Sequence, residues 1–471
     1  MREKLAKALE YISDRHIAEA AAAPKKLRRP VLRAIAALLA VVLLMNLPYI
    51  PMNVSAKTVS AASQSRKPAR PDRDDYEVWE DYRADADIYD AQLDQWRIDA
   101  SEAIQTLTPF FTKSTAGYMA GTTDNRVWSP VNAYIALAAL TETTAGESRQ
   151  QLLDVLGAED LNTLRRWTEA IWEEVYRDDG NEISVLANSL WLDQTLDYEQ
   201  EALDALAHHH YTSIYQTDLS SQRAGNALRA WLNNTTGGLL KNAVSQSGFP
   251  PEAVMTLAST VYLQSKWSDE FSVARTTLDV FHTPSGDRTV TFMKKKEMQG
   301  GYYWGESFGA TCLWLKNGCK MWFFLPDPDK TVDDVLAEGE YLTLLPPSEE
   351  GEKNSKYMKI NLSLPKFDIS SGGDLKEIFR ELGITDVFDL DTADFTAITS
   401  DSPVYLTGVN QAARVIVDEQ GVKAASYLEF PGAGAAMPPE EITDFVLDRP
   451  FLFVIADVSG IPLFTGVVNE P

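Results

Sequence analysis

The chain has 471 residues, of which 45% are hydrophobic and 10% aromatic, and its formal net charge is −25. This composition is typical of a globular protein with a sizeable core rather than of a disordered chain. The negative charge argues against a nucleic-acid partner, because no basic surface is available to displace phosphate counterions. The length fits one large domain or two to three average ones.

The N-terminus predicts a location outside the cytoplasm. Residues 1–33 are a basic segment expected in the cytoplasm, and residues 34–50 are an apolar run. Basic residues before such a run and acidic residues after it orient the following chain outwards. The run is short for a membrane span, and Val54-Ser55-Ala56 offers a cleavage site, so a signal anchor and a cleaved leader both fit. We expect the main domain at the extracellular face of the membrane or secreted.

Residues 51–100 are predicted to form an acidic linker or stalk. The part from Lys57 to Asp72 is rich in Ser, Ala and Pro, a composition typical of flexible linkers. The remainder contains scattered aromatic residues, so a further helix packed on the main domain is an open alternative. The main domain is predicted over residues 101–471.

Helical and strand patterns alternate in this main domain without a regular rhythm. Ser129 followed by Pro130 marks a helix start. Apolar residues recur at helical spacing from Leu161 to Tyr176, and Ile183–Leu192 has the pattern of a buried strand. The order predicts an α+β fold with a large mixed or antiparallel sheet.

Cys312 and Cys319 are the only cysteines, and they flank an Asn317-Gly318 hairpin signal. Such a hairpin separates them by roughly 13 Å along the ladder, too far for a disulfide. We therefore expect two free, largely buried thiols.

A stretch near the C-terminus combines the pattern of a strand with the composition of a loop. An apolar strand pattern at Val415–Val417 is followed by a turn at Gly421 and by alternation with a period of two from Val422 to Phe430. Several Pro and Gly residues beyond Phe430 indicate an exposed, extended loop. The stretch is either a surface connection with accidental alternation or a segment with two states, loop and strand.

Many motifs of the main domain resemble those of the serpin family in order and spacing. They are Asn125–Pro130, Ala187–Trp191, Trp231–Leu240, Tyr262–Trp267, Leu364–Phe367, Asp418–Gly421, Asp448–Ile455 and Gly466–Asn469. The resemblance, to a member of the bacterial type, implies an α+β serpin fold. This fold has a large central mixed β-sheet, two further sheets, about eight or nine helices and an exposed reactive-centre loop at about 421–441. It also implies a monomer.

The resemblance further implies a polar network beneath the central sheet, which we call the shutter: Ser129, Asn132, Ser259 and Gln411. Family members usually have Ser at position 132, Asn at 259 and His at 411, so the implied network is rewired. Separately satisfied core polar groups are the alternative. Trp267 would lie in the breach, at the strand end where the loop inserts.

The mechanism implied by the resemblance is that of a suicide pseudo-substrate for a serine protease. A protease cleaves the loop, forms an acyl-enzyme and is trapped when the loop inserts into the sheet. The implied hinge comprises Glu419, Gln420, Gly421, Val422, Lys423, Ala424, Ala425 and Ser426. Counting forward from Glu419 places the reactive bond at Ala435–Ala436, with one residue on either side as the alternative.

Small residues at that bond favour elastase-like or subtilisin-like proteases over trypsin-like ones. Inhibitory members prefer Thr or Ser at position 422, where this chain has Val422. They also prefer small residues through position 428, where this chain has Tyr427 and Leu428. The alternative function is therefore a non-inhibitory binding or structural protein of the serpin fold at the cell surface.

An enzyme is not expected, and we predict no catalytic residue, metal or cofactor. His208, His209 and His210 lack the i, i+4 spacing of a helical metal pair, so we expect a surface helix end. Lys294, Lys295 and Lys296 are expected on a solvated face, without a polyanion cofactor.

Overall fold

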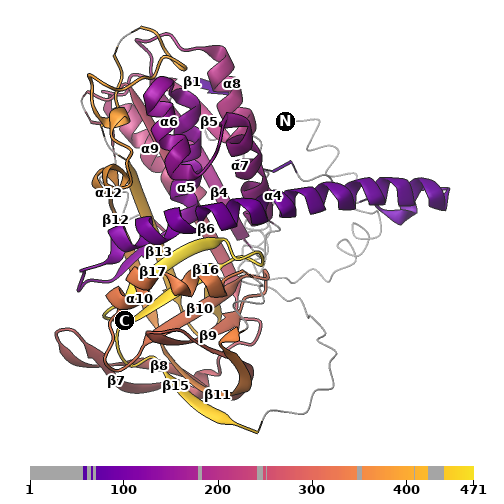
Figure 1. The fold of residues 1–471 in the computed structure, drawn as a ribbon, viewed down its shortest axis with the longest axis vertical. Helices are drawn as coiled ribbons and strands as arrows, with labels where there is room; N and C mark the ends of the chain where they lie inside the picture. Colours follow the sequence, from indigo (N-terminus) through magenta and orange to yellow (C-terminus); the bar gives the residue numbers. More distant parts are fainter. Residues whose placement is uncertain are drawn as a thin grey trace, which may run out of the picture. The chain divides into compact units, whose positions relative to one another are not determined.

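Helices and strands alternate irregularly along the chain (Figure 1). The computed structural model describes residues 57–60, 65–66, 71–178, 183–240, 248–250, 252–346, 353–401, 403–407, 409–422 and 440–471. The expected apolar run at 34–50 lies outside these residues. Within them, no helix combines the length and the apolarity needed to cross a membrane.

The described part contains eight α-helices, which supports the expected number. They are α4 (Trp79–Met119), α5 (Pro130–Thr143), α6 (Gly146–Leu156), α7 (Leu161–Val175), α8 (Gln200–His209), α9 (Gln222–Thr235), α10 (Val332–Glu338) and α12 (Lys376–Glu381). Short 3-10 helices lie at Arg73–Asp75, Val273–Arg275, Glu340–Leu344 and Asp386–Phe388.

The central sheet is mixed and has the strand order β1-β5-β4-β6-β14, with β3 paired to β4. Its strands are β1 (Lys57–Ser60), β3 (Arg177–Asp178), β4 (Ile183–Asp193), β5 (Thr212–Thr217), β6 (Met255–Lys266) and β14 (Gly421–Val422). Strands β4 and β5 run parallel, and the other pairs are antiparallel.

Two further sheets complete the fold and confirm the expected α+β class. A nine-stranded sheet has the order β15-β11-β8-β9-β10-β16-β17-β2, with β7 beside β8, and β12 pairs with β13. The strands are β2 (Arg126–Trp128), β7 (Thr277–Thr283), β8 (Gly286–Trp304), β9 (Phe308–Trp314), β10 (Lys320–Pro326), β11 (Ser355–Pro365), β12 (Phe367–Asp374), β13 (Asn410–Val417), β15 (Ile442–Val446), β16 (Phe451–Ala456) and β17 (Pro462–Val468).

Helix α5 lies at the centre of the core, and its sequence explains why. Ser129 caps the helix by accepting a hydrogen bond from the backbone N–H of Asn132, and Pro130 occupies the first turn, as predicted. Every residue from Pro130 to Thr143 is buried. A helix that is apolar on all sides must be covered on all sides, and β6 and β17 are among the elements that contact it.

The two faces of β6 contribute to two different cores, as the period of two in a strand requires. Leu257, Val261 and Leu263 pack in the main core, on the side of α5. Ala258 packs on the other face in a smaller cluster with Trp191 and with Trp231 of α9. Odd-numbered residues of β6 therefore point towards α5.

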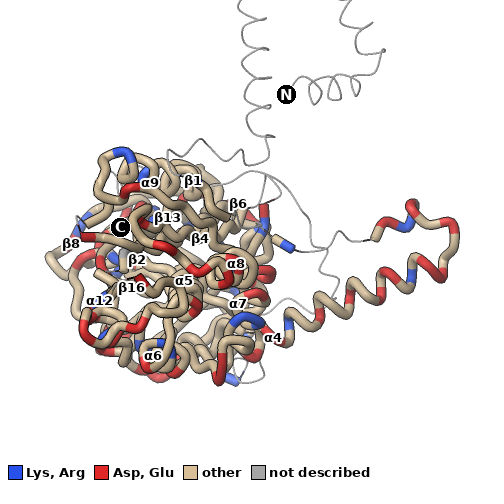
Figure 2. Tube along the Cα trace, turned by 90° about the horizontal axis from the view of Figure 1, so that it is seen from above, with Lys and Arg blue, Asp and Glu red and all other residues tan. Residues whose placement is uncertain are grey.

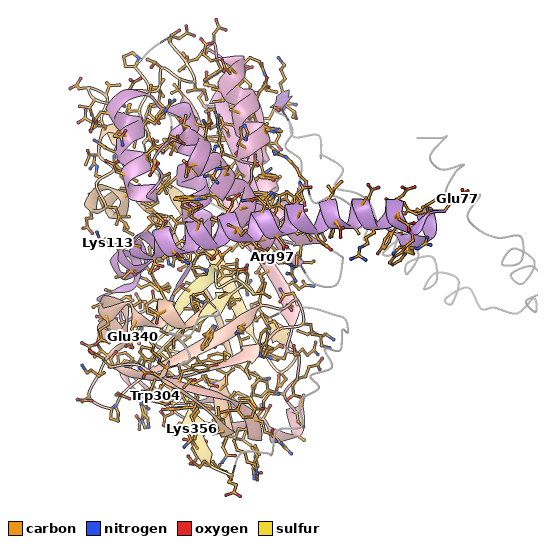
Figure 3. All side chains as sticks on the ribbon, turned by 45° about the vertical axis from the view of Figure 1, so that its right-hand side comes forward. Glu77, Arg97, Lys113, Trp304, Glu340 and Lys356 are labelled. Carbon is orange, nitrogen blue, oxygen red and sulfur yellow. The ribbon has the colours of Figure 1, made fainter. Side chains whose placement is uncertain are left out.

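Helix α4 spans the part of the chain that could not be decided from sequence. Its side chains are mostly exposed up to Ile98, and from Asp99 onwards one face of the helix is buried while Ser101 and Glu102 stay exposed. Figure 3 shows the helix extending away from the core between Arg97 and Glu77. Acidic residues outnumber basic ones along the exposed turns (Figure 2). One helix thus connects an acidic, solvent-facing segment with the core.

Two expectations for single side chains can be compared with their surroundings. Cys312 and Cys319 are free, as predicted. The solvated face expected for Lys294–Lys296 is wrong for Lys295, which is buried and forms an ion pair with Asp269. Neighbouring residues of a strand point to opposite faces, so the middle lysine of the three points inwards.

A buried carboxyl group follows strand β16. Asp457 accepts hydrogen bonds from the backbone N–H groups of Ser459 and Ile461 through Oδ1, whereas Oδ2 has no protein partner. Desolvation, assisted by the nearby charge of Glu174, raises the pKa of Asp457 to about 7. The unfolded chain would release this proton at about pH 4.

We predict that Asp457→Asn stabilises the protein at alkaline pH. Between about pH 4 and 7 the unfolded chain binds fewer protons here than the folded chain, so this carboxyl lowers stability as pH rises through that window. The variant should exceed the wild type by roughly 2–4 kcal/mol at pH 8 and match it near pH 4. Denaturant unfolding at both pH values measures the difference.

The control is Asp94→Asn on the exposed part of α4, which should change stability by less than about 0.5 kcal/mol at either pH. If Asp457→Asn raises the free energy of unfolding by the same amount at pH 4 and pH 8, the pKa of Asp457 is not raised by burial.

Candidate functional site

The central sheet is divided beside β6. On one side β6 pairs with β4 along ten residues, from Met255 to Gln264. On the other side, the only described residues that pair with it in a ladder are Gly421 and Val422. Strand β13 lies near β6 but pairs with β12 instead. The edge of β6 from Met255 to Gln264 therefore has no strand partner within the described chain.

The chain leaving β13 turns back into this gap. Asp418 Oδ1 accepts hydrogen bonds from the backbone N–H groups of Gln420 and Gly421, which closes a tight turn. Strand β14 follows and runs antiparallel to β6, with Gly421 opposite Lys266 and Val422 opposite Ser265. Val422 is buried, with 4% of its surface exposed. The strand thus begins between β6 and β13.

Gly421 permits the close approach of this turn to β6. Its φ is +149°, and a Cβ atom there would lie 2.5 Å from both Lys266 Cα and the carbonyl oxygen of Ser265. A side chain at this position would push β14 away from β6.

Trp267, the residue expected in the breach, fastens the turn from the end of β6. Its indole N–H donates to the carbonyl oxygen of Asp418 at 2.9 Å, and its backbone N–H donates to that of Gln420 at 3.0 Å. Glu419 is held by an ion pair with Lys366 at 2.6 Å and by the Thr276 hydroxyl at 2.8 Å. Desolvation opposes ionisation of Glu419, but these two partners outweigh it and lower its pKa.

The four residues expected in the shutter lie at the first turn of α5, in two hydrogen-bonded pairs. Gln411 on β13 accepts from the backbone N–H of Ser129 and donates to its carbonyl oxygen, both at 3.1 Å. Ser259 on β6 lies 2.5 Å from Asn132 Oδ1. The first turn of α5 is therefore bonded to both sides of the divided sheet.

Asn188 belongs to the same network, and sequence reasoning did not include it. It lies opposite Ser259 on β4, and its Oδ1 is 2.5 Å from the Ser259 hydroxyl. Its Nδ2 donates to the carbonyl oxygen of His210. An Asn in the middle of a buried strand was the available signal, because a buried polar side chain requires a partner.

The expected surface helix end at the three histidines is only partly observed. His208 is exposed, but His210 has no exposed surface and its Nε2 lies 3.2 Å from a carboxylate oxygen of Glu142. The chain turns inwards after α8 to enter β5, and this carries His210 into the core. The expectation is therefore wrong for this residue.

The remaining site predictions concern residues outside the described chain. These are hinge residues Lys423, Ala424, Ala425 and Ser426 and the reactive bond Ala435–Ala436. The described chain resumes at Glu440, ahead of β15, which runs parallel to β11.

The described residues define an α+β fold with a large mixed sheet, two further sheets and eight α-helices. The comparisons with known proteins identify the family. The family model described as Serpin (serine protease inhibitor) matches residues 111–471. The chain belongs to the serpin family, and this membership indicates a protease inhibitor rather than an enzyme.

Curated relatives cover most of the same region. The chain is 27% identical over 372 residues to Serpin-Z2B of Triticum aestivum, covering 74% of this chain and 91% of that protein. It is 26% identical over 364 residues to Alpha-1-antiproteinase of Callosciurus caniceps, covering 74% of this chain and 84% of that protein.

Solved structures agree on the fold. Tengpin, a thermophilic serpin in the native state, is 24% identical with a TM-score of 0.68, covering 78% of this chain and 94% of that one. Arabidopsis AtSerpin1 in its native stressed conformation is 22% identical with a TM-score of 0.67, covering 80% and 98%. Thyroxine-binding globulin in complex with thyroxine is 19% identical with a TM-score of 0.66, covering 78% and 98%.

We predict that Ser259→Ala destabilises the protein by weakening the contacts of β6 with α5 and β4. The substitution removes the hydroxyl that lies between Asn132 and Asn188, so the buried amide oxygen that accepts its single proton loses this partner. The free energy of unfolding should fall by about 1–3 kcal/mol. Chemical denaturation of the full-length chain measures it.

Ser220→Ala is the matched control, because the Ser220 hydroxyl donates to Asp218 within an exposed turn. It should cost less than about 0.5 kcal/mol. Equal losses for the two variants would show that Ser259 does not link the strands.

Proposed function

We propose that this serpin inhibits serine proteases by inserting its cleaved reactive-centre loop into the gap beside β6. The observation that carries the proposal is the pairing of Gly421 and Val422 with the end of β6, beside an edge with no other described partner. A loop whose first residues are already in register can extend the same ladder once a protease has cut it.

The register of β14 makes the inserted state specific. Continued along β6, it sets Ala424 opposite Leu263 and Leu428 opposite Ser259. Directly opposite residues of an antiparallel pair point to the same face. Val422, Ala424, Ser426, Leu428 and Phe430 would then face α5 and the main core, whereas Lys423 and Glu429 would face the other side. The alternation in the sequence matches this requirement.

Side-chain burial and new backbone hydrogen bonds would both favour insertion of the loop. Val422 is already buried, but burial of the Leu428 and Phe430 side chains would contribute roughly 1.5–3 kcal/mol each. Each new ladder hydrogen bond to the free edge of β6 would add about 1 kcal/mol. The uncut loop cannot use this free energy fully, because its far end is tied to β15. Cleavage releases that tie and makes the insertion irreversible.

The residues of the loop suggest the target. We infer that Ala435–Ala436 is the reactive bond and that elastase-like or subtilisin-like proteases attack it. A shallow primary pocket accepts Ala, whereas a trypsin-like pocket requires Lys or Arg. The basic N-terminus and the apolar run further suggest that this protein acts outside the cytoplasm, in an anchored or a secreted form.

Ligand binding without inhibition is the second candidate function for this fold. Thyroxine-binding globulin, one of the structural neighbours, is solved with thyroxine bound. Tyr427 and Leu428, just after the hinge, are larger than the residues that inhibitory members prefer there, which favours a non-inhibitory binding protein at the cell surface. The proteolysis experiments below separate this alternative from inhibition.

We predict that Val422→Arg abolishes trapping. The side chain at this position is buried against β6, and burial of an unpaired guanidinium costs several kcal/mol. The variant should be cleaved as a substrate without forming a complex that survives denaturing gels. Gel analysis with pancreatic elastase and a subtilisin gives the readout.

Val273→Arg introduces the same charge at a position that is 72% exposed, and it should trap like the wild type. Val422→Thr keeps a β-branched side chain of similar size, so this variant should also trap the protease. If Val422→Arg inhibits normally, the hinge assignment is wrong even though the protein is an inhibitor.

We also predict the position of the reactive bond. N-terminal sequencing of the fragment released by elastase should begin at Ala436. Ala435→Arg should move inhibition from elastase to trypsin, with a change in relative rates of roughly 100-fold or more, because the primary pocket dominates protease choice. Clean cleavage without any stable complex, by all three proteases, would favour the binding function.

A further inference from the structure

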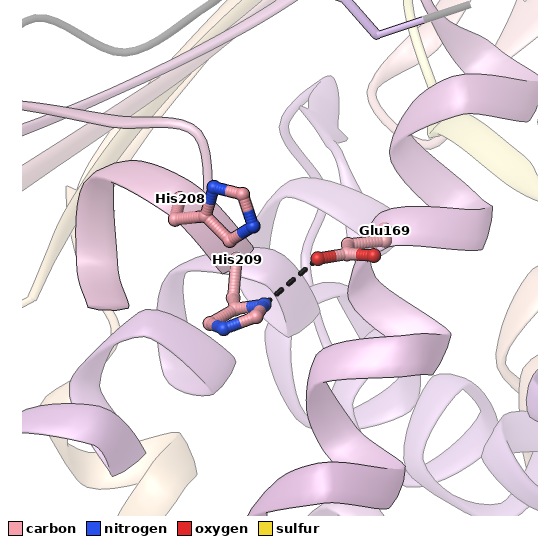
Figure 4. A group of neighbouring side chains, drawn as sticks. All are labelled: Glu169, His208 and His209. Atoms are coloured by element: carbon pink, nitrogen blue, oxygen red, sulfur yellow. Dashed lines mark hydrogen bonds and ion pairs between the residues drawn. The ribbon is translucent and has the colours of Figure 1, made fainter. Parts of the chain in front are cut away.

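Two histidines and a glutamate from neighbouring helices converge at the end of α8 (Figure 4). Glu169 lies on α7, and His208 and His209 are the last two residues of α8. His209 Nδ1 is 2.8 Å from Glu169 Oε1. One ligand atom from each of the three residues lies within 4.8 Å of the other two. Two imidazole nitrogens and a carboxylate oxygen thus share one small volume.

This donor set is suited to a borderline transition metal rather than to Ca²⁺ or Mg²⁺, which prefer all-oxygen ligands. Around a tetrahedral Zn²⁺ ion, ligand atoms lie about 2.0–2.2 Å from the metal and therefore roughly 3.3 Å from one another. The separation of His209 Nδ1 from Glu169 Oε1, 2.8 Å, is shorter than that value, and all three ligand atoms lie within 4.8 Å of one another. His208 is exposed and the other two residues are half-buried, so the His208 ring can turn and solvent can reach the site.

We propose that Glu169, His208 and His209 bind one divalent transition-metal ion such as Zn²⁺, with solvent in the fourth position. This site is separate from the loop and the gap beside β6 and does not depend on the proposed inhibition. A bound ion would join α7 to α8 through bonds stronger than the single hydrogen bond observed between Glu169 and His209.

Metal binding requires neutral imidazole and ionised carboxylate. Partial desolvation, and then the charge of Arg66, lower the pKa of His208. Desolvation alone would raise the pKa of Glu169, but the hydrogen bond with His209 and the charge of Arg66 outweigh it and lower the pKa.

Arg66 is the competing cation and makes the proposal easy to test. Its Nη1 is 3.2 Å from Glu169 Oε1, and its guanidinium lies 4.7 Å from the centre of the Tyr211 ring. Its backbone N–H donates to Glu173 at 2.6 Å. These additional contacts hold Arg66 near the site, where it repels a metal ion. Removal of its charge should therefore strengthen metal binding, whereas it would weaken a purely structural ion-pair cluster.

The sequence concealed this set because its third ligand comes from another helix. Adjacent histidines alone do not form a helical metal pair, which needs a separation of three or four residues. Glu169 reaches them only because α7 packs beside α8.

The test is titration of the full-length chain, without an affinity tag, with Zn²⁺ by calorimetry and with Co²⁺ by absorption spectroscopy. We expect one site with micromolar affinity, visible Co²⁺ bands typical of four or five ligands, and a higher unfolding temperature that a chelator reverses. The double variant H208A/H209A should weaken Zn²⁺ binding at least tenfold, and Glu169→Gln should weaken it several-fold.

Two further variants make the outcome decisive. His282→Ala removes an exposed histidine that pairs with Asp287, and it should leave the affinity within twofold of the wild type. Arg66→Gln should increase the affinity several-fold. Circular dichroism verifies the fold of each variant. Equal Zn²⁺ affinity in H208A/H209A and the wild type would overturn the proposal, as would no Zn²⁺ binding below millimolar concentration or weaker binding in Arg66→Gln.

Discussion

The first turn of α5 is hydrogen-bonded to both sides of a divided sheet, and the arrangement of the site depends on this double attachment. Ser129 holds Gln411 on β13, and Asn132 holds Ser259 on β6. The helix is buried over its whole length, so its position is determined by the core rather than by the strands. It can therefore act as a fixed reference against which β6 and β13 are held near each other without pairing.

Among the described residues, only β14 fills the gap, at one end of β6. Trp267 and Glu419 anchor the turn after β13 through the indole, the Lys366 ion pair and the Thr276 hydroxyl. This leaves a strand edge whose backbone groups have no ladder partner among the described residues. An unpaired edge usually promotes aggregation. Under the proposed function, the cleaved reactive-centre loop would complete this edge, and the pairing it would gain would be the source of the free energy of trapping.

The proposed metal site would lie away from the gap beside β6, and different interactions would form it. Loop insertion depends on burial and backbone pairing, whereas Glu169, His208 and His209 combine only because two helices pack side by side. His210, the next residue, is drawn into the core and its carbonyl oxygen accepts from Asn188. The end of α8 thus contributes to both regions, through consecutive residues that point in different directions.

Local patterns predicted the elements of this protein well. The cap at Ser129, the strand at Ile183–Leu192 and the α+β class all follow from spacing and composition, because capping and burial act over a few residues. Order and spacing of motifs also indicated the serpin family.

Only the tertiary structure decided which distant side chains meet. Asn188 joins Ser259 through the register of β4 and β6, Lys295 turns inwards against Asp269, and Glu169 reaches two histidines about forty residues away. Such contacts depend on how whole elements pack, and a linear pattern carries no information about that. The sequence pattern from Val422 to Phe430 indicated a segment that could form a strand, because alternation is a local property, whereas packing determined that β6 has an edge without a ladder partner among the described residues.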